Sequence, residues 1–177
     1  MFQAVNDSVL SQAIASARKR LVLLAPGISQ AVAAALQARL VSGGAGLRVT
    51  VVTEPDDDVV RIGYGDVDGL AMVAKIAEEH HIELRSQPGL RLGVLVCDDR
   101  VFIWSPTPRS VEAAPDSDER PNAIVLGAAA SDALVESVAP EWSETPRFRA
   151  EIGRDDMHDT EIDSHNASLE ANPPVDV

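Results

Sequence analysis

Residues 89–105 read GLRLGVLVCDDRVFIWS and say more about the fold than any other part of the chain. Two apolar runs flank the polar pair Asp98-Asp99, which is the pattern of a β-hairpin whose first strand is buried. We therefore expect one strand at residues 91–97 and a second at residues 101–104.

Helices and strands alternate on the amino-terminal side of this hairpin. Apolar residues recur at helical spacing in several segments, and short apolar or β-branched runs lie between them. The order predicts an α/β sandwich with a mixed, mostly parallel sheet, flanking helices and the hairpin. The expected helices span about residues 9–20, 30–41, 66–80 and 131–138, and the other expected strands span 21–25, 47–53, 82–85 and 122–126. Asp7 or Ser8 is the expected cap of the first helix, whose last turn holds the basic residues 18–20, and Ser29 is the expected cap of the second.

The net charge of −13 is concentrated in the last third of the chain. Residues 1–110 carry a net charge of −1, whereas residues 111–177 carry −12. The segment 111–121 is polar and contains two prolines, so we expect a flexible connection there. We expect an α/β domain at residues 1–140. A disordered acidic tail or linker at residues 141–177 is a candidate contact for another protein or domain.

The composition argues against several classes of protein. No run approaches the ~20 apolar residues that cross a bilayer, and the first 20 residues lack a signal-peptide hydrophobic region. We therefore expect a cytoplasmic protein without membrane contacts, and the alanine-rich, aromatic-poor composition is typical of a bacterial source. Cys97, the single cysteine, is expected to be a buried strand thiol. Without a basic run containing aromatic residues, the chain alone is not expected to bind nucleic acid.

The hairpin and the lead-in Arg85-Ser-Gln-Pro-Gly-Leu90 resemble the catalytic hairpin of the phospholipase D-like superfamily. That family carries His-x-Lys-x4-Asp along this strand. Here Arg91 stands in the place of the His, Gly93 in the place of the Lys, and Asp98 in the place of the Asp. The resemblance covers about residues 8–108 and identifies the chain as a degenerate, single-repeat member.

The resemblance implies that the hydrolytic machinery is lost. In the family a His attacks the phosphorus, a second His acts as general acid, and a Lys stabilises the phosphate oxygens. Arg91 stays protonated and cannot attack, and Gly93 has no side chain to hold a phosphate. Pro108 occupies the place of a family Asn. We therefore assign no catalytic residue and expect no cofactor.

The resemblance also implies an assembly. The family builds its active site from two such hairpins and this chain has one, so we expect a homodimer. The function expected is that of an inactive domain for dimerisation or interaction, or for sensing an anionic ligand. The alternative is a subunit of a nucleic-acid-processing or phosphodiesterase complex whose partner supplies the active half. A DNA-binding regulator fits less well, because the charge is −13 and no helix-turn-helix pattern is present.

Arg91 is the first candidate for a ligand-binding residue. Its guanidinium could hold an anion with two hydrogen bonds, or it could pair with a nearby carboxylate such as Asp98. Arg61 and Arg109 are the next candidates for the same anion, and Ser105 at the exit of the hairpin completes the set.

Two aromatic residues are candidates for a partner interface. Trp104 ends the hairpin, where it either belongs to the core or packs against a partner. Tyr64 lies between Gly63 and Gly65, where a tight turn with a packed ring is the other interpretation. For the acidic residues 54–58 we favour a solvated turn over a cation site, and no histidine has the spacing of a metal site, so we expect no bound metal.

Overall fold

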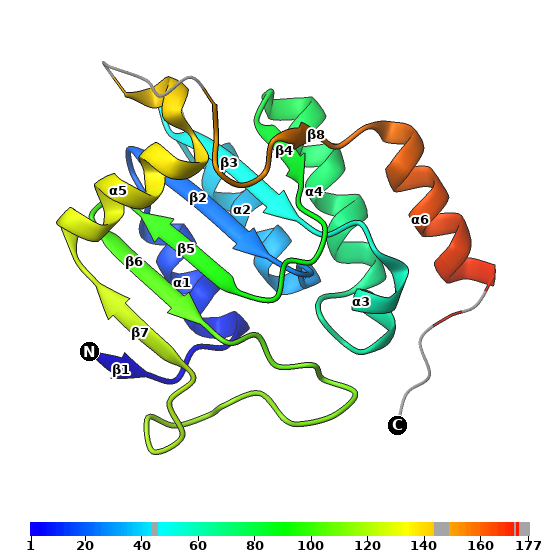
Figure 1. Ribbon diagram of the computed structural model, residues 1–177, viewed down its shortest axis with the longest axis horizontal. Helices are drawn as coiled ribbons and strands as arrows, with labels where there is room; N and C mark the ends of the chain where they lie inside the picture. Colours follow the sequence, from blue (N-terminus) through cyan, green and yellow to red (C-terminus); the bar gives the residue numbers. More distant parts are fainter. Residues whose placement is uncertain (44–45, 144–148, 172, 174–177) are drawn as a thin grey trace.

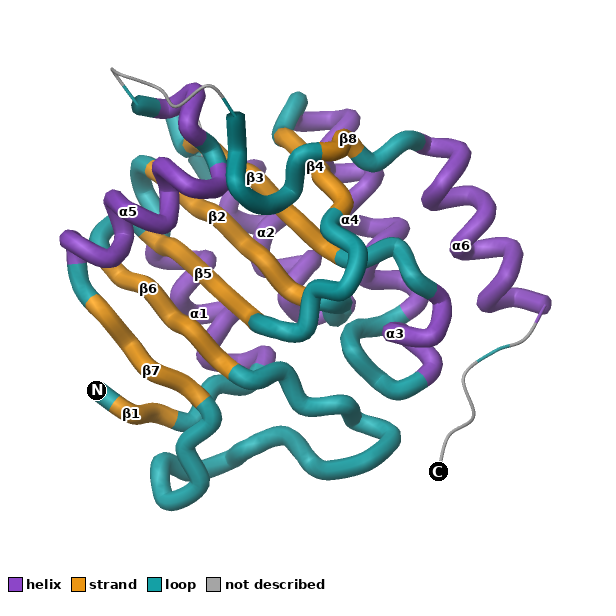
Figure 2. The backbone as a smooth tube through the Cα atoms, viewed as in Figure 1, coloured by secondary structure: helices purple, strands orange, loops and turns teal. Residues whose placement is uncertain are grey.

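The computed structural model describes residues 1–43, 46–143, 149–171 and 173. A twisted sheet forms its middle layer, with most helices on one face and a single helix on the other (Figures 1 and 2). The strands are β1 (Phe2–Gln3), β2 (Arg20–Ala25), β3 (Arg48–Thr53), β4 (Glu83–Ser86), β5 (Gly93–Cys97), β6 (Arg100–Trp104), β7 (Ala123–Leu126) and β8 (Asp155–Asp156). The helices are α1 (Asp7–Ser16), α2 (Gln30–Val41), α3 (Asp57–Arg61), α4 (Val67–His80), α5 (Ala128–Val138) and α6 (Asp159–Ala171), with a 3-10 turn at Pro140–Trp142.

The strand order is β1-β7-β6-β5-β2-β3-β4-β8, and the sheet is mixed. In the described chain, β3 runs parallel to β2 and to β4, whereas the other five pairings are antiparallel. The expectation of a mostly parallel sheet is therefore wrong. The reason is connectivity, because parallel neighbours need a helical crossover and only α2 and the α3–α4 segment supply one between adjacent described strands.

The predicted hairpin is confirmed. Gly93 pairs with Trp104 at its open end, and Cys97 pairs with Arg100 next to the turn. Asp98 forms that turn with a φ of 53°, a conformation that Asp tolerates better than most residues.

The ends of α1 differ from the expected ones. Asn6 is the N-cap instead of Asp7 or Ser8, and its Oδ1 accepts hydrogen bonds from the backbone N–H groups of Ser8 and Val9, each at 3.1 Å. The helix ends at Ser16, before the basic residues 18–20 that we expected in its last turn.

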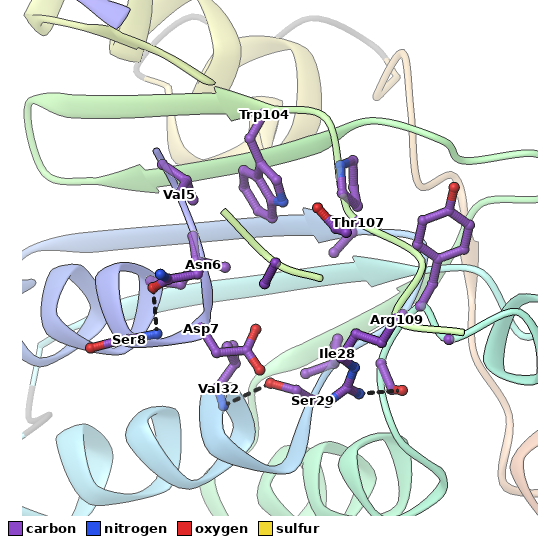
Figure 3. Close-up of a pocket in the computed structure, with 18 of the residues that line it drawn as sticks. Val5, Asn6, Asp7, Ser8, Ile28, Ser29, Val32, Trp104, Thr107 and Arg109 are labelled. Carbon is purple, nitrogen blue, oxygen red and sulfur yellow. Dashed lines mark hydrogen bonds between the residues drawn. The ribbon is translucent and has the colours of Figure 1, made fainter. Parts of the chain in front are cut away.

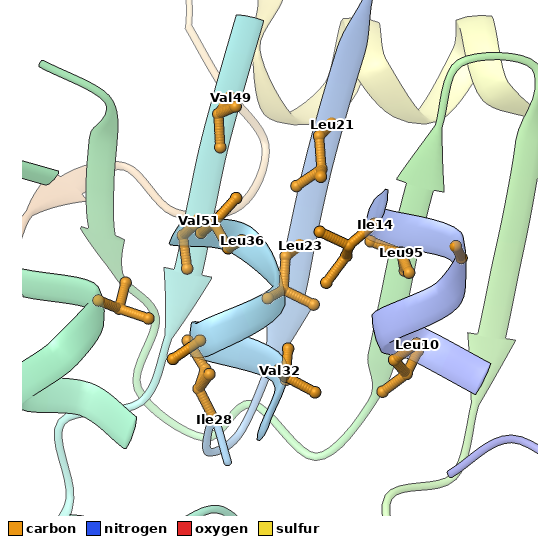
Figure 4. Packing of buried hydrophobic residues seen from close by; sticks show 14 of the residues in the cluster. Leu10, Ile14, Leu21, Leu23, Ile28, Val32, Leu36, Val49, Val51 and Leu95 are labelled. Carbon is orange, nitrogen blue, oxygen red and sulfur yellow. The ribbon is translucent and has the colours of Figure 1, made fainter. Parts of the chain in front are cut away.

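Side chains alternate between the two faces of the central strands and bury both of them. On one face, residues of β2, β3 and β5 pack against α1, α2 and α4; Leu21, Leu23, Val51 and Leu95 are members of this cluster (Figure 4). On the other face, Val22, Leu24, Val94, Val96 and their neighbours pack against α5. Continuous apolar strands therefore mark a sheet that is covered on both sides.

Part of the expected acidic tail is folded in the structure. Ile162, His165 and Leu169 are buried along one side of α6, which packs against α3 and α4. His165 Nδ1 lies 3.0 Å from Asp57 Oδ1 at this contact. Only three residues form the buried stripe, so the surrounding acidic sequence hides the helical period. The rest of the expected tail, at 144–148, 172 and 174–177, lies outside the described residues.

Residues 56–61 also differ from the expected solvated turn. Asp56 caps the short helix α3, with its Oδ1 accepting a hydrogen bond from the backbone N–H of Asp58 at 2.9 Å. Among the helices of the described chain, none is both long and apolar enough to cross a membrane.

Candidate functional site

One edge of the sheet brings together the elements of a candidate ligand site. β2 and β3 end at this edge, β5 begins there, and β6 ends there, because β5 is antiparallel to β2 and to β6. We call it the carboxyl edge. The first turns of α1 and α2 also line it, and a cavity of about 320 Å³ opens between them (Figure 3). Its walls come from residues 5–8 and 10, 23 and 25, 27–29 and 32, 63–65, and 104, 106, 107, 109, 114 and 115.

Trp104 fills the space in which the resemblance places the phosphate-holding Lys. A Cβ at Gly93 would lie 2.1–2.4 Å from three atoms of the Trp104 indole. Gly93 and Trp104 face each other across the β5–β6 ladder, and Trp104 is buried. The indole and any side chain at position 93 are therefore mutually exclusive in this arrangement. The sequence left open whether Trp104 belongs to the core or to a partner interface. In the structure it is part of the main core cluster, and it also forms one wall of the cavity.

Arg91 pairs with Glu54 instead of standing free for an anion. Its Nη1 donates a hydrogen bond to Glu54 Oε2, and Glu54 Oε1 accepts the backbone N–H of Gly89 at 2.9 Å. Glu54 is 6% exposed, so its carboxylate needs these donors. Of the two interpretations of Arg91, the structure shows the pairing with a carboxylate, with Glu54 in place of Asp98.

Replacing Arg91 with alanine is expected to lower the free energy of unfolding by about 1–2 kcal/mol, because the buried Glu54 carboxylate loses a charge-assisted hydrogen bond. Urea denaturation measures the change. Arg120→Ala is the matched control, since Arg120 pairs with Asp116 on the surface and its loss should change stability by less than about 0.5 kcal/mol. Equal effects of the two substitutions would contradict the assignment.

Arg109 lines the cavity from the loop between β6 and β7. Its Nη2 donates to the carbonyl oxygen of Gly65 at 2.6 Å and to Asp66 Oδ1. Asp66 Oδ2 in turn accepts the backbone N–H of Gln30, the first residue of α2, at 2.7 Å. Asp66 therefore connects the loop to α2, and the Arg109 guanidinium is paired with a carboxylate.

The remaining sequence candidates fall into two groups. Tyr64 lines the cavity from a turn whose flanking Gly63 and Gly65 have φ values of 95° and 80°, as a tight turn requires. Arg61 lies outside the cavity and bonds to Ser168 Oγ at 3.3 Å and to Asp58 Oδ1 at 3.2 Å. Ser105 is exposed and outside the cavity too.

Asp98 lies at the opposite edge of the sheet from Arg91, so the two residues do not form one site. Its carboxylate accepts the backbone N–H groups of Arg18, Lys19 and Arg20 at 2.9, 2.7 and 3.2 Å. Burial raises the pKa of Asp98, but these backbone hydrogen bonds outweigh it and hold the pKa below the usual 3.8. The three residues that we expected to end α1 bind the hairpin turn instead.

Sequence reasoning missed the carboxylate that does line the cavity. Asp7 was interpreted only as a capping residue, yet its side chain projects among the lining residues, toward Ile28 and Ser29 (Figure 3). It has no hydrogen-bond or ion-pair partner among the described residues. The capping side chains beside it are already engaged, since Ser29 Oγ accepts the Val32 N–H and Asn6 Oδ1 accepts two helical N–H groups.

Cys97 is buried, as predicted. Burial, with a smaller contribution from the Asp98 carboxylate, raises the pKa of its thiol to about 12. Because the thiolate is the reactive form, we expect no reaction with 5,5′-dithiobis(2-nitrobenzoate) at pH 8 in the native protein and full reaction in 6 M guanidinium chloride. Rapid labelling of the native protein would contradict this placement. Within the described residues, no group of three or more His, Cys, Asp or Glu side chains is arranged to hold a metal ion.

Comparisons with known proteins bear on the fold. No family model matches the chain, and no curated protein matches it. Among solved structures, a phosphatidylserine synthase from Haemophilus influenzae Rd KW20 is 14% identical over 97% of this chain and 46% of its own, with a TM-score of 0.50. Nuc, a phospholipase D family member from Salmonella typhimurium, is 19% identical over 73% of this chain and 81% of its own, with a TM-score of 0.49.

The archaeal chromatin protein TrmBL2 is 14% identical over 71% of this chain and 44% of its own, with a TM-score of 0.42. This chain therefore spans less than half the length of TrmBL2 and of the synthase. The likeness to the synthase extends over nearly the whole chain and shows that the two proteins share a fold.

Proposed function

We propose that this chain is a phospholipase D-like domain without hydrolytic activity, and that its carboxyl-edge cavity binds a small ligand for sensing or interaction. The observation that carries the proposal is the Trp104 indole lying against Gly93. A scaffold that retained phosphodiester cleavage by the family's route would need a phosphate-holding side chain at that position. The buried partner of Arg91 supports the same conclusion, because Glu54 neutralises the residue in the nucleophile position.

The cavity has the properties of a small-molecule site. Its volume of about 320 Å³ lies at the lower end of the usual range of about 300–1,000 Å³. Leucine, isoleucine, valine and tryptophan side chains form much of its wall, and a few polar groups lie among them. The residues that line the cavity in the structure all belong to this one chain. The homodimer expected from the resemblance is a separate proposal, which light scattering in solution tests.

An anionic ligand is the less favoured form of this proposal. Each of the three arginines that the sequence suggested for an anion faces at least one carboxylate. Arg91 pairs with Glu54, Arg61 with Asp57 and Asp58, and Arg109 with Asp66. The cavity therefore offers little free positive charge, and we propose a ligand whose apolar body provides most of the contact.

The test blocks the cavity from an exposed position. Ala114 lines the cavity, whereas its neighbour Ala113 does not, and both are exposed. We expect indole-3-ethanol to shift backbone amide resonances around the cavity in the wild type and in Ala113→Trp. In Ala114→Trp the affinity should fall at least tenfold. Equal binding by both variants, or resonance shifts elsewhere on the surface, would overturn the proposed site.

A further inference from the structure

The charge inside the cavity points to a class of ligand. Asp7 and Arg109 are the charged residues among the described lining residues, and Arg109 is held by Asp66 and the Gly65 carbonyl. Asp7 has no such partner among the described residues. The cavity therefore presents one carboxylate without a compensating cation.

The helix N-termini at this edge do not make the cavity favour an anionic ligand. The backbone N–H groups of Ser8 and Val9 are bound by Asn6, that of Val32 by Ser29, and that of Gln30 by Asp66. These are the groups through which a helix start usually holds a phosphate. Because intramolecular acceptors already occupy these four groups, a ligand anion that used any of them would have to displace a cap and approach Asp7.

The apolar residues of the cavity wall indicate what the uncharged part of the ligand must be. Leu10, Leu23, Val32 and Trp104 are buried residues of the main core cluster and also line the cavity. A ligand that fills the space therefore needs an apolar body, and a carboxylate next to an apolar wall selects a cationic nitrogen at one end. Thr107 lines the same cavity, and its hydroxyl can accept a further N–H group.

We infer, on the basis of the proposed function, that the cavity takes a primary amine on an apolar body, with the ammonium group paired to Asp7. Trp104 and Arg109 line the same cavity as Asp7, which is itself half-buried. An ion pair at a partly desolvated site gains more from its charge than one in open water. Preference for the ammonium over a hydroxyl of the same shape follows from this pair.

Three probes of similar shape test the inference: tryptamine, indole-3-ethanol and indole-3-propionate. Tryptamine carries an ammonium at neutral pH, indole-3-ethanol is neutral, and indole-3-propionate is an anion. By isothermal titration calorimetry we expect tryptamine to bind the wild type about tenfold more tightly than indole-3-ethanol, and indole-3-propionate to bind most weakly.

Asp7→Asn should abolish the preference for tryptamine and leave the affinity for indole-3-ethanol within about twofold, because a hydrogen-bonded charge pair is replaced by a neutral contact. Asp68→Asn is the matched control, since Asp68 is an exposed carboxylate in the first turn of α4 and lies outside the cavity. It should keep the preference. Circular dichroism at the titration temperature verifies that both variants are folded.

The outcomes separate this inference from the proposed function. If Asp7→Asn keeps the tryptamine preference, or if the wild type shows none, the ammonium pairing is wrong. If indole-3-ethanol still binds in a manner that Ala114→Trp blocks, the ligand-binding proposal stands without it. Binding of all three probes that Ala114→Trp leaves unchanged would overturn both.

Discussion

Replacing Gly93 with alanine is expected to destabilise the domain by about 3 kcal/mol, because the new methyl group overlaps the buried indole of Trp104. Because Trp104 also lines the cavity, any shift of the indole that relieves the overlap should change the shape of the ligand site. We expect a lower urea midpoint together with weaker binding of indole-3-ethanol. Gly127→Ala is the control, since no heavy atom lies within 4 Å of a Cβ built there, and its cost should stay below about 1 kcal/mol.

A double-mutant cycle tests the same contact. Trp104→Ala alone should cost about 3–5 kcal/mol through lost burial and an enlarged cavity. In the Trp104→Ala background, Gly93→Ala should cost little, so the two effects should fall short of additivity by about 2 kcal/mol or more. Additive effects would show that the indole does not exclude a side chain at position 93.

Replacing Asp98 with alanine is expected to cost about 3 kcal/mol at pH 7. The substitution removes the acceptor for the backbone N–H groups at residues 18–20 and leaves alanine at a φ of 53°. Asp98→Asn should cost less, because asparagine tolerates this backbone conformation and retains one acceptor oxygen. Asp99→Asn is the control, since Asp99 is 79% exposed and its 3.6 Å ion pair with Arg20 contributes little.

The Asp98 contribution also depends on pH. The pKa of Asp98 is lowered in the folded state, so its stabilisation is fully present above the ordinary pKa of 3.8 that the unfolded chain has and is lost as the pH falls through the folded-state pKa. We therefore expect the stability difference between the wild type and Asp98→Asn to shrink between pH 6 and pH 2.5. A difference that grew on acidification would contradict the assigned hydrogen bonds.

The sequence predicted the elements that carry a strong local pattern. The apolar runs of β2 and β5, the Asp98-Asp99 turn, and the Ser29 cap of α2 are encoded by neighbouring residues, and the structure shows all of them. The sheet directions were harder to predict, because pairing between strands depends on contacts that are distant in sequence. Helix α6 was missed because its buried stripe is only three residues long among acidic neighbours.

The site was less predictable than the fold for a similar reason. The resemblance pointed to the exit of the hairpin, and Trp104, Tyr64 and Arg109 line a cavity at that edge of the sheet. It did not reveal that a carboxylate more than thirty residues away in sequence, Glu54, would engage Arg91. Nor did it reveal Asp7, which the sequence suggested only as a helix cap, a role that Asn6 has in the structure.

Hydrolysis of bis-p-nitrophenyl phosphate by the purified wild-type chain tests the central claim most directly. With Trp104 in the space of the phosphate-holding side chain and Arg91 neutralised by Glu54, we predict nitrophenol release no faster than in buffer. Turnover that rises in proportion to protein concentration, and that Ala114→Trp abolishes while Ala113→Trp preserves it, would show that this edge of the sheet still performs phosphodiester chemistry.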